Sequence, residues 1–315
     1  MDELEKHLQN YVDYLRTKKY SERTIAGYSI EIKLFFKWLK KKNIYKLSEI
    51  KSITIQDYQA YLSSAQSSQT KKNYPPSTQR RKLLDLKVFF KFLVKTDAAI
   101  SEPSKNIVLP AKQKNFKWNL LSLYNIKKIL LSIDLSKPLF YRDRTIIEIL
   151  YTTGMRASEI CNLKIGDIDY KSNYIKINSG KGNIDRFVPA CSRALDFTLT
   201  YIEKYRNKFV KQNSYDFIFL SCTGEKLTKH TILAIIKKYT LSASLDKNFS
   251  PHCFRASAAT HMLKNGADIR YIQQLLGHKT IDTTMDYLKL EKSELKRIHT
   301  ASHPRETFRK KDRNE

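Results

Sequence analysis

One segment of the chain, residues 165–190, differs in pattern from the sequence around it. In "IGDIDYKSNYIKINSGKGNIDRFVPA" apolar and polar residues alternate, and the alternation is interrupted at residues 171–173 and again at 180–182. Alternation with a period of two is typical of half-buried strands, and short turns join antiparallel neighbours. The segment therefore predicts a small sheet of three antiparallel strands.

Apolar residues recur at helical spacing over most of the remaining chain. Ser21 is a suitable N-cap for a helix in "ERTIAGYSIEIKLFFKWLKKKN", and Ser77 is one for "TQRRKLLDLKVFFKFLVK". The second helix would carry apolar residues along a single face: Leu83, Leu86, Phe89, Phe90 and Leu93. Many helices and one small sheet predict a mainly α fold.

The helical pattern breaks at residues 101–119, "SEPSKNIVLPAKQKNFKWN", which contain two prolines and several lysines. A chain of 315 residues is long enough for about two domains, each with its own core. We therefore expect a small helical domain at residues 1–107, a linker at 108–118, and a larger helical domain with the small sheet at 119–315.

The charge of the chain indicates a polyanionic partner. Lysine and arginine outnumber aspartate and glutamate 58 to 31, and an apolar content of 41% argues against disorder. Nucleic acid is the simplest such partner, although a lysine-rich genome would also raise the lysine count. Arg80, Lys87 and Lys91 would form a basic stripe opposite the apolar face of their helix, either as a solvated face or as phosphate contacts.

The four cysteines contain no CxxC pair and are interpreted as free thiols in a reducing compartment: Cys161, Cys191, Cys222 and Cys253. The N-terminus is charged and amphipathic, unlike a signal peptide, and no stretch approaches the roughly 18 apolar residues of a membrane span. We expect a cytoplasmic protein with no membrane partner.

Several polar residues lie at predicted helix boundaries. Ser250-Pro251 is a strong helix start, so His252 and Arg255 would share a face at a helix N-terminus, where anions bind well. Gly154 permits a tight turn before Arg156.

Further candidate residues also lie at a predicted helix end or turn. Gly277 can end a helix just before His278, and Lys181 lies in a glycine turn of the predicted sheet. Each of these features is common by chance, and a single residue such as Tyr287 carries little information. Their occurrence in this order is informative.

The ordered set resembles the tyrosine recombinase (phage integrase) family. "TTGMRASEI", "GKG", "HCFR", "LLGH" and "TIDTTMDY" are similar to its successive motifs, and the N-terminal helices resemble its core-binding domain. The ending "IHTASHPRE" is similar to the Xer-type and integron-type branches. In "FRASAATH" this chain has Ala256 where many members have histidine, and no further N-terminal arm-binding domain is expected. The resemblance implies these catalytic residues: Arg156, Lys181, His252, Arg255, His278 and Tyr287.

By this resemblance, Tyr287 attacks the scissile phosphate and leaves a 3′-phosphotyrosine and a free 5′-hydroxyl. A tyrosine of pKa near 10 is only about 0.1% ionised at pH 7, so His252 is expected to act as its general base or to orient it. Lys181 would protonate the departing 5′ oxygen.

The remaining residues of the implied set contact the phosphate. Arg156 and Arg255 would bind the non-bridging oxygens, where negative charge accumulates, and His278 would donate a hydrogen bond to the same group. Glu159 is interpreted as a structural support. The sequence offers neither a carboxylate cluster nor a phosphate-binding loop, so we expect neither a metal nor another cofactor.

The family implies a tetramer acting on two double-stranded DNA sites through a Holliday junction. Two alternatives stay open: "ADIRYIQQLLGHKTIDTTMDYL" is compatible with a helix-turn-helix regulator, and a type IB topoisomerase would use similar chemistry. The sequence does not reveal the target site or whether a second recombinase or an activator takes part. It also leaves open chromosome dimer resolution, plasmid resolution, transposition and phage integration.

Overall fold

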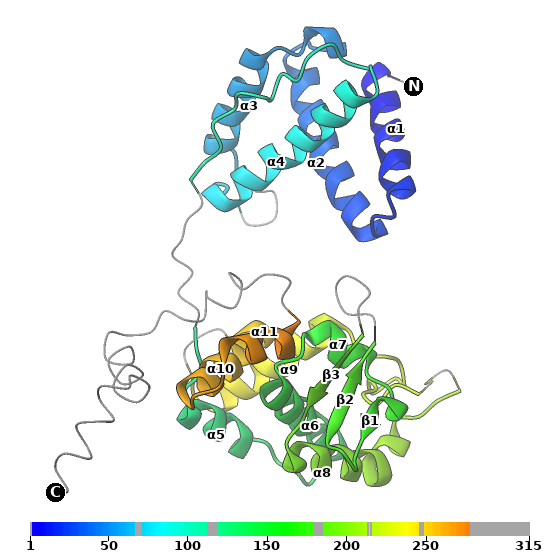
Figure 1. Ribbon diagram of the computed structural model, residues 1–315, viewed down its shortest axis with the longest axis vertical. Helices are drawn as coiled ribbons and strands as arrows, with labels where there is room; N and C mark the ends of the chain where they lie inside the picture. The colour runs from blue at the N-terminus through cyan, green and yellow to red at the C-terminus, as the bar shows by residue number, and fades with distance from the viewer. Residues whose placement is uncertain are drawn as a thin grey trace, which may run out of the picture. The chain divides into compact units, whose positions relative to one another are not determined.

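The computed structural model describes residues 2–66, 71–111, 119–178, 185–212, 214, 216–245 and 249–277. The chain divides into two compact units, Met1–Phe116 and Lys117–Glu315 (Figure 1). Both units are mainly helical, and the second contains one three-stranded sheet. The predicted fold class is therefore confirmed. No helix of the described residues is long and apolar enough to span a membrane.

The described residues of the N-terminal unit form four longer helices and a short 3₁₀ turn around an aromatic core. The elements are α1 (Glu3–Thr17), α2 (Glu22–Lys41), the 3₁₀ turn Leu47–Glu49, α3 (Ser52–Ser64) and α4 (Pro76–Lys95). Tyr11, Phe35 and Phe89 are fully buried in this core. Edge-on ring contacts join Tyr11 to Phe89 and Phe35 to Phe90, an arrangement that aromatic rings prefer.

The helix starts in this unit agree only in part with the sequence. Ser21 caps α2, because its hydroxyl accepts a hydrogen bond from the backbone N–H of Thr24, as predicted. The expected cap at Ser77 is wrong: Pro75 is the N-cap of α4 and Pro76 its first residue. Proline suits the first helical position because its fixed φ is already helical and its missing N–H would have had no partner.

In the second unit, helices pack against one face of a small sheet. The helices are α5 (Leu123–Leu131), α6 (Pro138–Thr153), α7 (Ala157–Asn162), α8 (Ser192–Thr200), α9 (Lys229–Ser242), α10 (Pro251–Lys264) and α11 (Ile269–Leu276). Shorter helical turns lie at Ile165–Asp167, Tyr201–Tyr205 and Arg206–Lys208. Its core continues from the helices onto one face of the sheet.

The strands are β1 (Ile168–Asp169), β2 (Tyr174–Ile177) and β3 (Arg186–Pro189). They pair antiparallel in the order β1-β2-β3, which confirms the predicted meander. Ile175 of β2 lies opposite Ile168 of β1 and Val188 of β3, and all three side chains are buried. The apolar half of the alternating pattern thus forms the core face of the sheet.

Helix α6 is the central helix of this unit and is buried along most of its length, including its charged residues. These charges are paired: Arg142 binds Asp143 at 2.7 Å and Arg144 binds Glu148 at 2.8 Å. Pairing offsets the cost of removing a charge from water. The helix ends at Gly154, whose φ of 61° is left-handed, and the chain then turns toward Arg156.

Candidate active site

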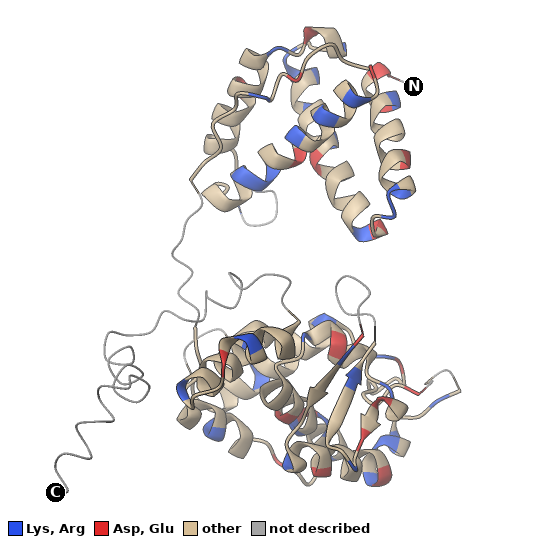
Figure 2. Ribbon diagram, in the orientation of Figure 1, with Lys and Arg blue, Asp and Glu red and all other residues tan. Residues whose placement is uncertain are grey.

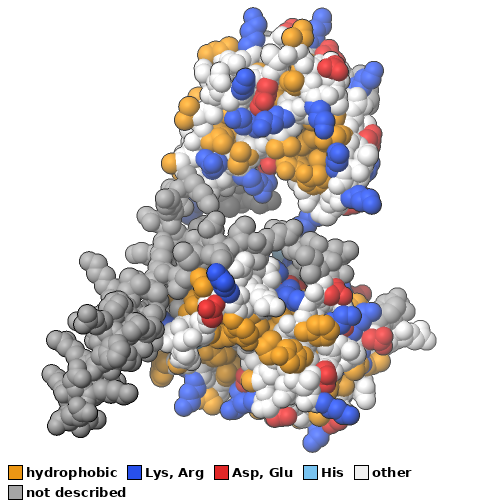
Figure 3. Space-filling view, viewed as in Figure 1, with side chains coloured by type: hydrophobic (Ala, Val, Ile, Leu, Met, Phe, Trp, Pro, Cys, Tyr) orange, Lys and Arg blue, Asp and Glu red, His pale blue; other side chains and the backbone are white. Residues whose placement is uncertain are grey.

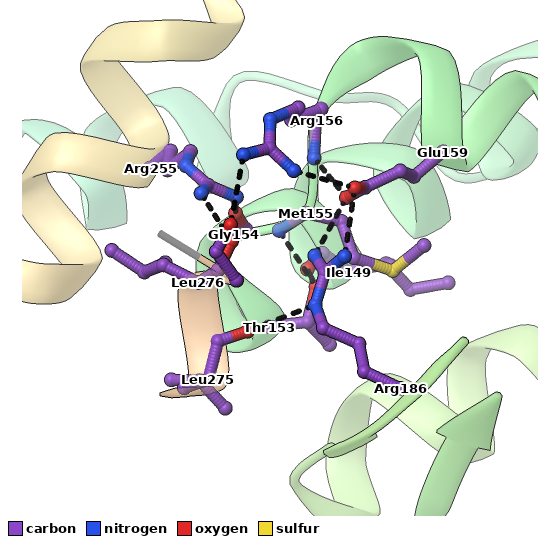
Figure 4. Close-up of polar contacts among 11 residues, drawn as sticks. Ile149, Thr153, Gly154, Met155, Arg156, Glu159, Arg186, Arg255, Leu275 and Leu276 are labelled. Atoms are coloured by element: carbon purple, nitrogen blue, oxygen red, sulfur yellow. Dashed lines mark hydrogen bonds and ion pairs between the residues drawn. The ribbon is translucent and has the colours of Figure 1, made fainter. Parts of the chain in front are cut away.

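Arg255 lies in the first turns of α10, which begins as predicted, with Ser250 as its N-cap and Pro251 as its first residue. Its side chain is only 2% exposed. Nη1 donates to the carbonyl of Gly154 at 2.6 Å and Nη2 to that of Leu276 at 2.5 Å (Figure 4). Arg255 therefore joins the C-terminal ends of α6 and α11 at the start of α10.

Arg156 is the N-cap residue of α7 and comes from a different part of the chain. Its Nη1 donates to Oε1 of Glu159 at 2.9 Å, and Nη2 is 3.4 Å from the carbonyl oxygen of Gly277. The side chain is 24% exposed, so part of the guanidinium remains accessible. Because Gly277 directly follows Leu276, Arg156 and Arg255 meet at the same helix end (Figure 4).

Two glycines permit this close packing. Gly154 has a left-handed φ, and a Cβ at this position would lie 2.7 Å from a methyl carbon of Leu276. Gly277 ends α11 with a φ of 63°, as predicted for a helix C-terminus. A side chain at Gly154 would push the end of α11 away from the two arginines.

His252 is the second residue of α10 and shares its first turn with Arg255. The ring is exposed, yet partial desolvation, followed by the positive charges of Arg255 and Arg156, lowers its pKa below the ordinary value of 6.5. His252 is therefore neutral at pH 7 and can accept a proton. The structure thus brings together three of the predicted site residues: Arg156, His252 and Arg255.

Glu159 and Arg186 form the supporting part of the site. Glu159 is buried; burial by itself would raise the pKa of its carboxyl, but hydrogen bonds from Arg186 and from the backbone of Arg156 lower it. Arg186, the first residue of β3, donates Nη1 and Nη2 to the two oxygens of Glu159, each at 2.9 Å. No local sequence signal marks Arg186, since only the register of β3 brings it to Glu159.

Three predicted catalytic residues, Lys181, His278 and Tyr287, lie outside the described residues. The described chain stops at Asn178 and resumes at Asp185 around Lys181, and it ends at Gly277, directly before His278. Their roles stay predictions.

The predicted basic stripe of α4 has mixed surroundings. Arg80 donates to the carbonyl of Pro110 at 2.8 Å, and Lys87 donates to that of Lys105 at 3.1 Å. These contacts hold residues 105–110 against α4. Lys91 is exposed, and Figure 2 shows further lysine and arginine residues along the helix. Figure 3 shows basic side chains on this face, with hydrophobic side chains exposed between them.

The geometry favours a phosphate-binding site. Two guanidinium groups and the N-terminus of α10 supply positive potential, and guanidinium groups match phosphate oxygens in shape. His252 adds a proton acceptor beside them. Among the described residues, no group of three side chains is arranged to hold a metal ion.

Comparisons with known proteins identify the family of the chain. Residues 120–294 match the phage integrase family, and residues 7–100 match the phage integrase N-terminal SAM-like domain. Tyrosine recombinase XerD of Staphylococcus epidermidis is 32% identical over 300 residues, covering 95% of this chain and 98% of the relative.

Solved structures show the same fold. The crystal structure of XerA recombinase has a TM-score of 0.53 at 29% identity and covers 96% of this chain and 99% of its own. That of XerH site-specific recombinase bound to difH substrate has a TM-score of 0.67 at 24% identity, covering 94% and 83%. The chain therefore belongs to the phage integrase family and is an Xer-like tyrosine recombinase.

Proposed function

We propose that this tyrosine recombinase, a DNA strand exchange enzyme, cuts and rejoins double-stranded DNA at a specific site through a 3′-phosphotyrosine intermediate. One observation carries the proposal: Arg156 and Arg255 converge at the end of α11, immediately before the chain continues to His278, and His252 lies in the first turn of α10 beside Arg255. Phosphoryl transfer to a tyrosine needs groups that bind the phosphate and remove a proton, and these side chains supply both.

The two arginines stabilise the charge that develops on the non-bridging oxygens. Arginine keeps its charge at any working pH, and its planar fork can bind two oxygens of one phosphate. Arg156 is the more accessible of the pair, with its Nη2 turned away from Glu159 and toward Gly277. Arg255 is buried, so its charge acts in surroundings that screen it poorly.

In this proposal Tyr287 is the nucleophile and His252 removes or orients its proton. Lys181 protonates the leaving 5′ oxygen, and His278 donates a hydrogen bond to the phosphate. The roles of Tyr287, Lys181 and His278 are carried over from the family motifs "TIDTTMDY", "GKG" and "LLGH". No step in this sequence requires a metal or a nucleotide.

The partner we propose is a recombination site in duplex DNA, bound by a tetramer that joins two sites through a Holliday junction. Support comes from the net charge of +27 and from the relative XerH, which is bound to its difH substrate. The helical N-terminal unit would contact the duplex through residues that include Arg80, Lys87 and Lys91. The cytoplasmic location expected from the sequence belongs to the same proposal.

The test uses a suicide substrate, a duplex nicked near the cleavage position. The short fragment that carries the free 5′-hydroxyl then diffuses away after cleavage, and the covalent adduct accumulates. The wild-type protein should give an SDS-resistant protein–DNA adduct on DNA that carries its site. Tyr287→Phe should bind the same DNA with unchanged affinity and give no adduct, because the nucleophilic oxygen is missing. An adduct that persists in Tyr287→Phe would place the nucleophile on another residue.

A supercoiled plasmid without the site distinguishes recombination from relaxation. The recombinase should leave this plasmid supercoiled while it forms adducts on the site-containing substrate. Relaxation of the plasmid at random positions would favour the topoisomerase alternative instead. Binding without any adduct in the wild-type protein would favour the regulator.

A further inference from the structure

Arg186 occupies a position where three elements of the site meet. It is the first residue of β3 and lies five residues after Lys181 in the sequence. Its guanidinium lies between Glu159 of α7 and the end of α11 (Figure 4). Only 14% of the side chain is exposed, so Arg186 is not a surface residue with a chance ion pair.

The contacts of Arg186 differ from those of Arg156 on the same carboxylate. Arg186 binds both oxygens of Glu159 in a fork, through Nη1 and Nη2. Arg156 reaches only Oε1 with its side chain, through Nη1, while its backbone N–H donates to Oε2. Arg186 thus contacts both oxygens of Glu159 with its side chain, whereas the side chain of Arg156 contacts one.

A second set of contacts joins Arg186 to the end of α11. Its Nε donates to the carbonyl of Leu275 at 3.2 Å. A Cβ on Gly277 would lie 3.3 Å from Cδ, Nε and Cζ of Arg186, so the side chain packs directly against the helix cap. The carbonyl of Gly277 is also the group that faces Nη2 of Arg156.

We propose that Arg186 is a positioning residue for DNA cleavage, which rests on the function proposed above. By occupying Glu159 in a fork and holding the end of α11, it keeps Arg156 from closing onto the carboxylate and leaves Nη2 of Arg156 available to the scissile phosphate. Glu159 has a lowered pKa and stays ionised, so its attraction for Arg156 is permanent. Arg186 limits that attraction.

Loss of Arg186 should therefore redirect Arg156 without removing it. In Arg186→Ala the carboxylate of Glu159 has no second guanidinium, and Arg156 is free to bind both oxygens. A displacement of this kind costs phosphate stabilisation in the transition state, and misplacement by about 1 Å can slow a reaction by about 10²-fold. We expect Arg186→Ala to cleave the suicide substrate about 10²-fold more slowly than wild type, with unchanged affinity for the site.

Removing the charge of Glu159 gives the sharpest readout. Arg186→Ala combined with Glu159→Gln leaves Arg156 beside a neutral amide that holds it weakly. This double variant should cleave faster than Arg186→Ala alone. A role of Arg186 in folding alone predicts the opposite, because the second substitution removes a further buried contact. A double variant that is slower than Arg186→Ala would overturn the proposal.

A neutral substrate tests whether the loss passes through the phosphate charge. A methylphosphonate at the cleavage position replaces one anionic oxygen with a methyl group, so less charge needs stabilising. The difference in cleavage rate between wild type and Arg186→Ala should be smaller on this DNA than on the ordinary substrate. A partly unfolded variant would instead lose the same factor in cleavage rate on both substrates. Equal losses on the two substrates, or wild-type cleavage by Arg186→Ala, would exclude a positioning role.

Two controls keep the outcomes distinct. Arg144→Ala breaks the buried ion pair with Glu148 in the same unit. This variant should lose the same factor in cleavage rate on the two substrates, because the described contacts of Arg144 include neither Glu159 nor α11. Should Arg186→Ala fail to fold, Arg186→Lys keeps the charge without the fork and should show the same substrate dependence. If wild type gives no adduct, the proposed function fails; if only the Arg186 predictions fail, that function stands.

Discussion

Arg255 shows how a single residue can be buried, charged and stable at once. Its two carbonyl partners, Gly154 and Leu276, lie at the C-terminal ends of α6 and α11. Carbonyls at a helix C-terminus lack partners within the helix and carry the negative end of its dipole. Two such ends therefore stabilise one guanidinium in a position where an unpaired charge would be costly. In the proposed mechanism, the same arrangement fixes the positive charge that the scissile phosphate would face.

His252 allows a prediction about pH. A general base must be neutral to accept a proton, and desolvation together with the charges of Arg255 and Arg156 lowers the pKa of this imidazole. Cleavage measured as kcat/KM should therefore be constant near pH 7 and fall only below pH 6.5, as His252 becomes protonated. His252→Gln should lose this acidic limb and be about 10²-fold slower or more, the range typical of a general base. A limb centred above pH 6.5, or one retained in His252→Gln, would contradict the assignment.

At the scale of residues, the sequence predicted those groups whose position follows from a local helix boundary. Arg156 and Arg255 stand beside a glycine turn and a Ser-Pro start, and the structure places both as expected. Arg186 could not be found in this way. Its pairing with Glu159 depends on which residue of β3 faces α7, and a shift of one residue would turn the side chain to the other face of the sheet.

At the scale of elements, the site is a meeting of helix ends. The C-terminal ends of α6 and α11 and the N-terminal end of α10 converge, and the glycine caps allow the approach (Figure 4). The helices and the meander were predictable from the sequence because hydrophobic periodicity is a local pattern. The convergence of the helix ends was not predictable, because α6 and α11 are far apart in the sequence and meet only through packing.

Gly154→Ala tests this convergence. The new Cβ would lie 2.7 Å from a methyl carbon of the buried Leu276. The backbone at this position would also hold alanine at a left-handed φ. We expect the variant to lose about 1–3 kcal/mol of unfolding free energy, judged from the urea midpoint, and to cleave more slowly as α11 shifts. Gly166→Ala is the matched control, since a Cβ there meets no atom within 4 Å. Similar stability of the two variants would show that α11 adjusts without cost.

At the scale of the whole molecule, the basic residues serve more than one purpose. Some are internal and add nothing to the net charge: Arg142, Arg144 and Arg186 are each paired with a carboxylate within the fold. On α4, Arg80 and Lys87 hold residues 105–110 through backbone carbonyls, so their removal would disturb the N-terminal unit as well as its charge. Lys91 is exposed and gives the cleaner test of phosphate contact.

The salt dependence of DNA binding measures how much of this charge meets phosphate. Each phosphate that is neutralised releases condensed counterions, so the logarithm of the binding constant should fall linearly with the logarithm of salt, by about 0.9 per contact. Lys91→Gln should reduce the magnitude of the slope by about 1 and weaken binding to all duplexes alike, because a phosphate contact carries no sequence information.

Lys87→Gln is the comparison, and its slope should change less, since Nζ of Lys87 already donates to the carbonyl of Lys105. An unchanged slope for Lys91→Gln, measured by fluorescence anisotropy on a labelled site over a range of salt, would show that this side of α4 is a solvated face. The contact with DNA would then have to come from another surface of the N-terminal unit or from the catalytic unit.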